Sequence, residues 1–495
     1  MQSSRSIKGD SVTKNYIYQS AYQVLSLILP FVTAPYIARV FGTEGTGIYS
    51  YTNSVLFFFT MVANLGISNY GNREIASNVD DVDKLSTTFW GIYFCHFFMT
   101  LITLIAYCIY VFFIATKYVD AFLWQSIQIF ATLFNITWFF SGIQKFKITV
   151  RKNLIIRLIT VALIFLVVKK PDQVWRYILI LAAGNFVGQV VVWTQLKKYI
   201  VWKKVSFHDV IVHFRPMLIL FIPVLAMSVY RYMDKIMIPI FSNISELGLY
   251  ENSEKVVSLP LTLITTIGVV LLPKMSNLAQ NGEKSEQKRY FGFALKYSSI
   301  FAIALTCGLI GIAPVFAPVF FGEEFRKSGE LISLLAITIL FLTWSNSIRS
   351  QWLIPNRRDN VFIIAAFSGS AVNLVLNIIL ISKCGAKGAV YATIITEFIV
   401  TVVHVAFSKR EIQYFKIIKS VIPFMILGFL MTLAVRVLGS IMTETILTLV
   451  CQTLLGMAVY ICIGAIILRI QHDPLYDYAK GKTLRALSKK NKNNK

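Results

Sequence analysis

The chain has 495 residues, of which 56% are hydrophobic and only 15% are charged. Soluble domains are about 45–50% apolar and about 25% charged, so this composition excludes an ordinary soluble enzyme, a disordered chain and a disulfide-stapled secreted scaffold. The charge is unbalanced, with 48 Lys and Arg against 24 Asp and Glu and a formal net charge of +24. Such an excess is typical of proteins that bind nucleic acid or anionic lipid, and of membrane proteins whose orientation follows from basic loops.

Fourteen apolar stretches follow one another along the chain, and each is close to the about 20 residues that a helix needs to cross a bilayer. We therefore predict an all-α integral membrane protein with about fourteen transmembrane helices. No gap between neighbouring stretches is long enough for a soluble domain. The predicted spans are 16–41, 46–68, 86–115, 118–140, 153–168, 173–196, 215–241, 246–273, 290–321, 328–354, 360–381, 386–407, 414–438 and 444–470.

The basic residues predict the orientation of these spans. The first fifteen residues are polar, so we expect no cleavable signal peptide, and the first span would act as the insertion signal. An even number of spans places both termini on one side, and most Lys and Arg fall in the tails and loops of that side. The positive-inside rule therefore predicts cytoplasmic termini. The basic stretch 480–495 is interpreted as a tail near an anionic leaflet, not as a nucleic-acid site.

No motif predicts a metal or an organic cofactor. The six cysteines form no CxxC pair and the five histidines show no ligand spacing, so we expect no metal site. The Gly-rich segment 42–47 follows a predicted membrane helix and lacks the Lys-Ser/Thr of a phosphate-binding loop. The energy for any transport would then come from an Na⁺ or H⁺ gradient, the membrane potential or removal of the product.

An internal repeat is visible at an offset of about 200 residues. FGTEGTGIYSYTNSV from Phe41 matches FSNISELGLYENSEKV from Phe241, and a weaker match joins WFFSGIQKF from Trp138 with WSNSIRSQW from Trp344. Both matches recur six spans apart, so the halves have the same orientation and form a parallel repeat. The predicted parts are a cytoplasmic N-tail (1–15), an N-lobe (16–213), a C-lobe (214–410), two further helices (411–470) and a basic cytoplasmic tail (471–495).

Eight short segments together carry a resemblance to a known family that covers essentially the whole chain. The set resembles the multidrug/oligosaccharidyl-lipid/polysaccharide exporter superfamily and, within it, the Wzx-type flippases of O-antigen and capsular repeat units. The segments are PYIARVFGTEGTGIYSY (35–51), NLGISNYGNREIA (64–76), WFFSGIQKFK (138–147), YRYMDKIMI (230–238), LGLYENSEKV (247–256), LLPKMS (271–276), QWLIPNRRDN (351–360) and GAKGAVYATIITE (385–397).

The resemblance implies two six-helix lobes around a central cavity that opens alternately to each side of the membrane, with two additional C-terminal helices. It implies a flippase that moves an undecaprenyl-pyrophosphate-linked oligosaccharide from the cytoplasmic to the outer leaflet of the bacterial cytoplasmic membrane, for O-antigen, capsule or exopolysaccharide biosynthesis. The expected partners are this glycolipid, membrane lipid, a polysaccharide polymerase and a chain-length regulator.

Ionisable side chains gather in the seventh and eighth predicted spans, where each charge costs about 2.5–3.5 kcal/mol. Helical spacing places those of each span on one face; they are Arg231, Asp234, Lys235, Glu251, Glu254 and Lys255. The functional interpretation is a polar wall on which Arg231, Lys235 and Lys255 offset the charge of a pyrophosphate. The structural alternative is that Arg231–Asp234 and Glu251–Lys255 neutralise one another as helix-surface pairs.

A cation site is a second hypothesis. Asp234, Asn373, Asn377 and Thr393 offer hard oxygen ligands and one negative charge, and the resemblance implies a sodium site built from the equivalent helices in some lipid II flippases. Those proteins use a second carboxylate where this chain has the neutral Asn377. Interhelical packing of the asparagines is the structural alternative, and a proton could instead couple through Asp234 or Glu397.

The remaining candidates lie near the ends of predicted spans. Arg157 could admit a phosphate at the inner mouth, because a guanidinium matches phosphate oxygens, or could mark topology alone. For Arg349, Arg357 and Arg358 we favour topology. Tyr22 and Tyr49 could stack on sugar rings, although interfacial anchoring is the simpler interpretation.

Two other function classes stay open. A drug or cation antiporter of the same superfamily would usually stop at twelve helices and would favour an acidic cavity. A membrane enzyme of lipid-linked sugars needs a sizeable outer loop with clustered carboxylates or histidines for acid–base chemistry. The predicted outer loops are short and hold one carboxylate pair, Glu323 and Glu324. We therefore predict a transporter and not an enzyme.

Overall fold

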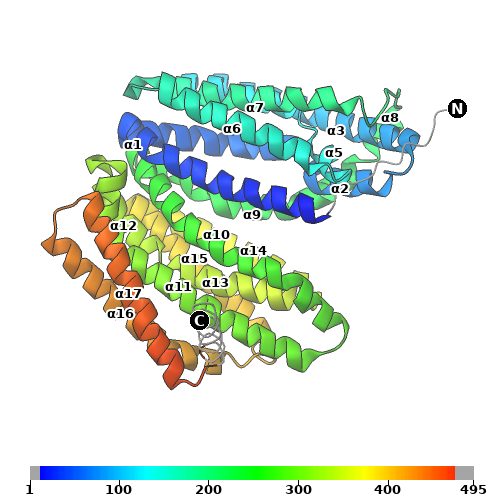
Figure 1. The fold of residues 1–495 in the computed structure, drawn as a ribbon. Coiled ribbons are helices and arrows are strands. Elements are labelled where there is room, and N and C mark those ends of the chain that lie inside the picture. Colours follow the sequence, from blue (N-terminus) through cyan, green and yellow to red (C-terminus); the bar gives the residue numbers. More distant parts are fainter. Residues whose placement is uncertain (1–11, 474–475, 477–495) are drawn as a thin grey trace, which may run out of the picture. The chain divides into compact units, whose positions relative to one another are not determined.

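The computed structural model describes residues 12–473 and 476, and in this part the regular structure is helical throughout (Figure 1). The side chains of residues 12–28, which include Tyr22, lie outside the described set, as does most of both predicted tails. The helices are α1 (Val12–Asn64), α2 (Ile67–Ser77), α3 (Val82–Ile109), α4 (Val119–Thr132), α5 (Thr137–Gly142), α6 (Phe146–Val167), α7 (Val174–Leu196), α8 (Phe207–Ile211), α9 (Phe214–Phe241), α10 (Ile244–Gln280), α11 (Lys284–Phe321), α12 (Arg326–Leu335), α13 (Thr338–Ile348), α14 (Asp359–Cys384), α15 (Ala386–Ser408), α16 (Tyr414–Ile441) and α17 (Ile446–Ile470). Short π-helical turns, η1 (Tyr110–Ile114) and η4 (Arg349–Leu353), and 3₁₀ turns, η2 (Pro171–Gln173) and η3 (Glu323–Phe325), join some of them.

The helices confirm an all-α, multi-pass membrane protein. Within the described residues, 8 helices are long and apolar enough to cross a bilayer, or 9 if the pair Glu323–Leu335 and Thr338–Leu353, bent by 42°, forms one broken span. The predicted spans 16–41, 46–68, 118–140, 153–168 and 215–241 are not among them, although each contains helix in the structure. The count of fourteen therefore stays a prediction.

The first two predicted spans form one long element, α1, with a break at Gly42. Gly42 has φ 65° and ψ −167°, a backbone conformation that residues with a Cβ rarely adopt. The break lies at the second residue of the first repeat motif, so the rest of the motif begins a new helical segment.

The chain divides into two compact units. Unit 1 comprises residues 1–252 and 374–389, and unit 2 comprises residues 253–373 and 390–495. The helix α9 and the first turns of α10 thus belong to unit 1. The lobe boundary at 213/214, inferred from the repeat, stays a prediction.

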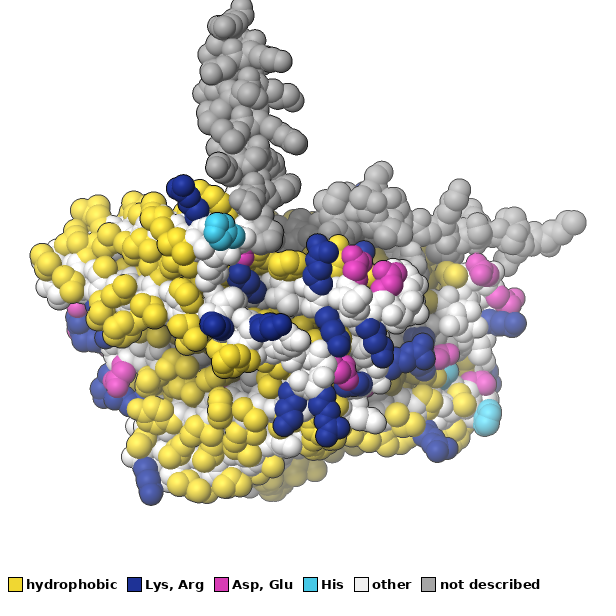
Figure 2. Space-filling view, turned by 90° about the horizontal axis from the view of Figure 1, so that it is seen from below, with side chains coloured by type: hydrophobic (Ala, Val, Ile, Leu, Met, Phe, Trp, Pro, Cys, Tyr) yellow, Lys and Arg dark blue, Asp and Glu magenta, His cyan; other side chains and the backbone are white. Residues whose placement is uncertain are grey.

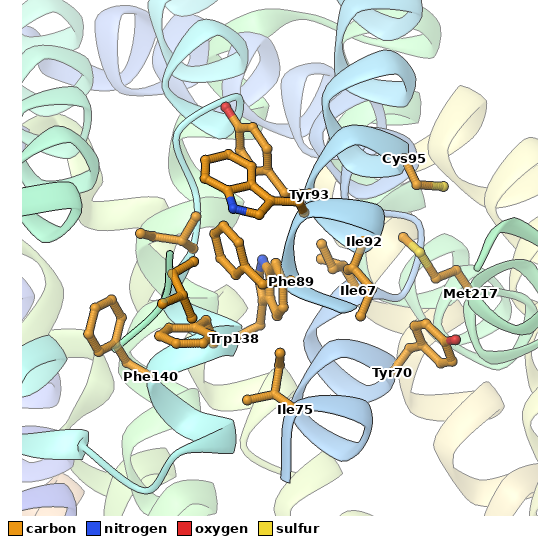
Figure 3. Close-up of a cluster of buried hydrophobic side chains, with 14 of the residues drawn as sticks. Ile67, Tyr70, Ile75, Phe89, Ile92, Tyr93, Cys95, Trp138, Phe140 and Met217 are labelled. Atoms are coloured by element: carbon orange, nitrogen blue, oxygen red, sulfur yellow. The ribbon is translucent and has the colours of Figure 1, made fainter. Parts of the chain in front are cut away.

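An aromatic core holds the helices α2, α3, α5 and α7 of unit 1 together (Figure 3). The rings of Phe89 and Trp138 stack with their centroids 5.4 Å apart. Gly71 of α2 lies against the Trp138 ring, where a Cβ would come within 2.5 Å of the indole. Tyr70 reaches away from this stack, and its hydroxyl lies 2.7 Å from Nδ1 of His213. The helices α2 and α5 are short, and side-chain packing therefore holds them in place.

The second unit is centred on α11, which packs against α16 and α17 (Figure 1). Phe424, Leu427, Met431 and Val435 of α16 are at most 2% exposed and form the seam. Their spacing of three or four residues is that of one helix face. The last two helices are therefore integral to unit 2.

Large apolar side chains remain exposed on the outer faces, as Figure 2 shows for one side of the molecule. Phe429 of α16 and Ile461 of α17 are 62% and 66% exposed. Such broad apolar areas are rare on soluble monomers and fit contact with lipid. Lys and Arg side chains gather in groups between the apolar areas in the same view.

Candidate functional site

The two copies of the repeat motif meet at a crossing of α1 and α10. A Cβ at Gly47 would lie 2.0 Å from the carbonyl oxygen of Ile244, and a Cβ at Gly248 would lie 1.9 Å from that of Thr43. Each of these carbonyls belongs to the residue four positions before the opposite glycine. The contact is therefore reciprocal, as at a two-fold axis, and only glycine permits it because the backbones touch.

One turn further along, the two motifs meet through side chains. Ser50 and Glu251 are 201 residues apart, the same separation as the two glycines, and the Ser50 hydroxyl donates a hydrogen bond of 2.7 Å to Oε2 of Glu251. Both residues are buried. Equivalent positions of the two repeats thus bond directly to each other, and one of them carries a charge.

Glu251 also forms an ion pair with α9. The Nζ atom of Lys235 lies 2.8 Å from Oε2 of Glu251, and the two side chains are only 13% and 10% exposed. The same ammonium lies 5.6 Å from the ring centroid of Tyr232, which in turn stacks on Phe57 of α1 at 3.9 Å. The ion pair therefore ties α9 and α10 to α1 in a largely dehydrated setting.

Asp234, the neighbour of Lys235, forms a second network. Its Oδ2 accepts a 2.8 Å hydrogen bond from the Tyr250 hydroxyl, and its Oδ1 accepts one from Nδ2 of Asn377 on α14. The three side chains are at most 5% exposed. Asp234 and Lys235 are consecutive on α9, and Tyr250 and Glu251 are consecutive on α10, so the two networks lie side by side.

A third contact holds the α14–α15 turn to the same place. Oε2 of Glu246 on α10 accepts a 3.0 Å hydrogen bond from the backbone N–H of Ala386, the first residue of α15. A carboxylate at a helix N-terminus is favourable because the helix dipole is positive there. The turn itself depends on Gly385, which has φ 57° and lies against the Glu246 carboxylate.

The structure brings some of the predicted site residues together. Asp234 and Asn377 bond to each other through the amide nitrogen of Asn377, whereas Asn373, Thr393 and Glu397 belong to unit 2. Lys235 pairs with Glu251. Arg231 is exposed, whereas the neighbouring Asp234 is buried and bonds to Tyr250 and Asn377.

The other predicted residues are spread over both units. Arg157 is half-buried on α6 in unit 1, and Lys255 is half-buried on α10 in unit 2. The ring of Tyr49 packs edge-on against Tyr177 with centroids 4.9 Å apart, so it is part of the helix packing. Tyr22 lies outside the described side chains.

The three arginines at the end of the tenth predicted span differ in their surroundings. Arg358 forms an ion pair with Glu411, and Arg357 is exposed at a turn with φ 58°. Arg349 is half-buried in η4, donates 3.1 Å to Oδ1 of Asn346, and lies over the Phe362 ring at 5.1 Å. Among the described residues, no carboxylate lies within ion-pair distance of Arg349.

Sequence reasoning missed two site residues, Ser50 and Tyr250. Both lie inside the repeat motif, and a residue-by-residue overlay of its two copies pairs Ser50 with Glu251 and Tyr49 with Tyr250. That overlay was the available signal, because a polar residue matched to a buried acid at a small-residue crossing is a candidate contact.

Comparison with known proteins decides the family. The family model described as "Polysaccharide biosynthesis protein" matches residues 12–279, more than half of the chain. The chain belongs to this family. A relative from Shigella dysenteriae, named "Putative O-antigen transporter", is 23% identical over 394 residues, which are 78% of this chain and 97% of the relative. An Escherichia coli (strain K12) protein of the same name is 21% identical over 411 residues, 81% of this chain and 97% of that protein.

A solved structure supports the fold of this polysaccharide biosynthesis protein. The structure titled "Lipid II flippase MurJ, inward closed conformation" aligns with a TM-score of 0.71 and 17% identity, over 92% of this chain and 99% of that one. At this identity the likeness shows the fold alone. The resemblance of the sequence to the exporter superfamily is thus confirmed by family, relatives and fold.

Proposed function

We propose that this protein is a flippase for lipid-linked oligosaccharides in surface polysaccharide biosynthesis. The observation that carries the proposal is the family match, together with relatives named as O-antigen transporters over nearly their whole length. The geometry agrees, because buried ionisable groups on membrane helices are joined where the two repeats touch. The names of these relatives favour this function over a drug or cation antiporter and over an enzyme.

The proposed substrate is an undecaprenyl-pyrophosphate-linked oligosaccharide, moved from the cytoplasmic to the outer leaflet by alternating access. We place the protein in a bacterial cytoplasmic membrane with both termini in the cytoplasm, on the strength of its basic loops and tails. A polymerase and a chain-length regulator would act on the product. Secondary transport is proposed because no ATP-binding loop is present in the sequence.

Asp234 is the proposed coupling residue. Its carboxylate and the side-chain oxygens of Asn377, Asn373 and Thr393 are the hard ligands that Na⁺ prefers, and the buried Asp234–Asn377 pair already brings two of them together. To offer its oxygen, the Asn377 amide would have to turn over. A proton on Asp234, or on the buried Glu397, is the other form of coupling.

The proposed anion contacts are the Lys and Arg side chains of the predicted site. Arg231 is exposed, and Arg157 and Lys255 are half-buried. Lys235 can serve only when it leaves Glu251, since the pair occupies its ammonium. We add Arg349, because its guanidinium is oriented by Asn346 and Phe362 without a carboxylate partner among the described residues.

A genetic experiment tests the proposal. Disrupting the gene in its source cell should leave labelled lipid-linked repeat units on the cytoplasmic face, and a plasmid copy should restore their export. Normal arrival of these units at the outer leaflet, in a cell without a redundant flippase, would overturn the proposed function.

A further inference from the structure

Two adjacent residues of α10 take part in two different networks. Tyr250 donates to Asp234, and Glu251 accepts from Ser50 and Lys235. We infer that Tyr250 is a positioning residue that links the charge on Asp234 to the contact between the two repeats. The inference rests on the proposed transport function, because it assigns a second residue to the coupling site.

The first step is the hydrogen bond between Tyr250 and Asp234. Its 2.8 Å length joins a phenol to a carboxylate, and the two residues are 3% and 5% exposed. A hydrogen bond to an ionised acceptor is about twice as strong as one between neutral groups. Neutralising Asp234, by a proton or by a bound cation, therefore weakens the force that holds the Tyr250 ring in place.

The second step is the rigidity of the first turns of α10. Gly248, Tyr250 and Glu251 lie within a single helical turn, and Gly248 touches the Thr43 carbonyl with no side chain between them. Packed backbones have no slack to absorb a local shift. A movement of Tyr250 is therefore passed to Glu251 and to its bond with Ser50.

The third step is a difference between the two repeats. The counterpart of Tyr250 in the first repeat is Tyr49, whose ring packs on Tyr177. The residue 201 positions before Asp234 is Thr33, whose hydroxyl bonds to the carbonyl of Leu29 on its own helix. The carboxylate link thus exists in the second repeat alone, which a purely structural feature of the motif would not require.

Several charged or titratable groups lie on the elements around Asp234. They are Arg231 and Lys235 on α9, Glu246, Tyr250 and Glu251 on α10, and Tyr49 on α1. The described partner from α14 is the neutral amide of Asn377. Changing Asp234 to Asn removes one charge and leaves the others, so it isolates the link through Tyr250.

A double-mutant cycle on the full-length protein tests the inference. The six native cysteines, of which Cys384 and Cys462 are exposed, are replaced by serine. Ser54→Cys, one turn along α1 from Ser50 and 1% exposed, supplies one buried reporter thiol and keeps the Ser50–Glu251 bond. The rate at which a small charged methanethiosulfonate modifies this thiol reports opening of the α1–α10 contact. Asp234→Asn should raise the modification rate about tenfold when Tyr250 is present. A change of this size lies within the range of coupling free energies found between residues of one hydrogen-bond network.

Tyr250→Phe alone should raise the rate by a similar factor, and adding Asp234→Asn to it should change the rate by no more than about twofold. Tyr49→Phe, the matched change in the first repeat, should leave the rate as it is. Independent, multiplicative effects of Asp234→Asn and Tyr250→Phe, or an unchanged rate in Tyr250→Phe, would overturn the inference.

A charge-preserving variant covers the case in which Tyr250→Phe does not fold. Asp234→Glu should keep the parental rate, and a rate equal to that of Asp234→Asn would overturn the inference. The labelling needs no transported substrate. Loss of flipping with the expected labelling rates would therefore refute the proposed function and leave this inference standing. Normal flipping with labelling rates other than those expected would refute the inference and leave the proposed function standing.

Discussion

The Ser50 hydroxyl donates a hydrogen bond of 2.7 Å to the Glu251 carboxylate, and the two residues occupy equivalent positions 201 residues apart in the two repeats. Pseudo-symmetry therefore places a neutral donor opposite a charged acceptor. Lys235 of α9 neutralises the acceptor from the side. The repeats are held together by a contact that is symmetric in its backbone and asymmetric in its charge.

The glycines of the crossing should tolerate no side chain. Gly248→Ala would place a Cβ 1.9 Å from the Thr43 carbonyl oxygen, and relieving such overpacking typically costs about 1–3 kcal/mol. We expect a lower free energy of unfolding, measured by thermal unfolding in detergent, together with reduced flipping. The matched control is Gly292→Ala on α11, where a Cβ meets no atom within 4 Å and helix propensity should make alanine neutral or stabilising. Equal stability of both variants would contradict the close approach.

The Lys235–Glu251 pair should behave as a buried ion pair. Lys235→Met leaves the Glu251 charge without its cation, and removing one partner of a buried pair costs about 3–5 kcal/mol. The double variant Lys235→Met/Glu251→Gln should recover most of that loss, because no lone charge remains. Unfolding temperatures of the single and double variants check this, and additive losses would show that the two charges do not interact.

Asp234→Asn should abolish transport or remove its dependence on the coupling ion. The asparagine keeps the shape of the side chain and can still accept from Tyr250, but it can neither bind a proton nor supply a negative ligand. Flipping measured over a series of Na⁺ concentrations and pH values checks this. Asp80→Asn, on an exposed turn, makes the same change elsewhere and should leave transport as it was. Parental flipping by Asp234→Asn under all these conditions would refute the coupling role.

Substitutions of Arg349 and Arg358 should have different effects, one on substrate binding and the other on stability. Arg349→Gln removes a guanidinium without a carboxylate partner among the described residues, so we expect transport at low substrate to fall about tenfold or more, given the 1.5–3 kcal/mol of a charged hydrogen bond. Arg358→Gln breaks the partly exposed pair with Glu411, which should cost stability by about 0.2–1 kcal/mol and leave substrate dependence unchanged. The opposite assignment of the two effects would refute the role of Arg349.

The connection between α16 and α17 should contribute a pH-dependent part of the stability, and this part should require Arg326. Nη1 and Nη2 of Arg326 donate to both carboxylate oxygens of Glu444 at 2.8 and 2.6 Å, and these hydrogen bonds hold the pKa of Glu444 below its ordinary value of 4.5. A lowered carboxyl pKa contributes stability above the ordinary value and loses it as the pH falls. The difference in unfolding temperature between the parent and Arg326→Gln should therefore shrink below about pH 4.5. Lys327→Gln, the exposed neighbour, should show no such dependence.

The sequence was sufficient for the fold class. Hydropathy measures whether a helix can cross a bilayer, and the last four predicted spans agree with α14 to α17 to within a few residues. It was less informative at 16–68, where α1 covers most of two predicted spans and the break between these spans is the backbone conformation of Gly42.

Only part of the site was predicted from the sequence, and there is a physical reason why the rest was not. Rules of helical spacing compare residues on one helix, so they suggested Glu251–Lys255 and Arg231–Asp234. The structure also supplies partners from other helices, as Lys235 does for Glu251 and Asn377 does for Asp234. Which helices cross at Gly47 and Gly248 is decided by packing, and Ser50 becomes a site residue only through that crossing.

Transport by the purified protein tests the proposed flippase function without the other proteins of the cell. Vesicles containing the full-length chain and a labelled undecaprenyl-pyrophosphate oligosaccharide are treated with a membrane-impermeant reagent that modifies the glycan. We expect that glycan beyond the fraction initially exposed becomes modified in these vesicles, faster than in protein-free vesicles and faster than in vesicles with Gly248→Ala. Equal modification in all three preparations, under both Na⁺ and H⁺ gradients, would refute the proposal that this protein flips lipid-linked oligosaccharides.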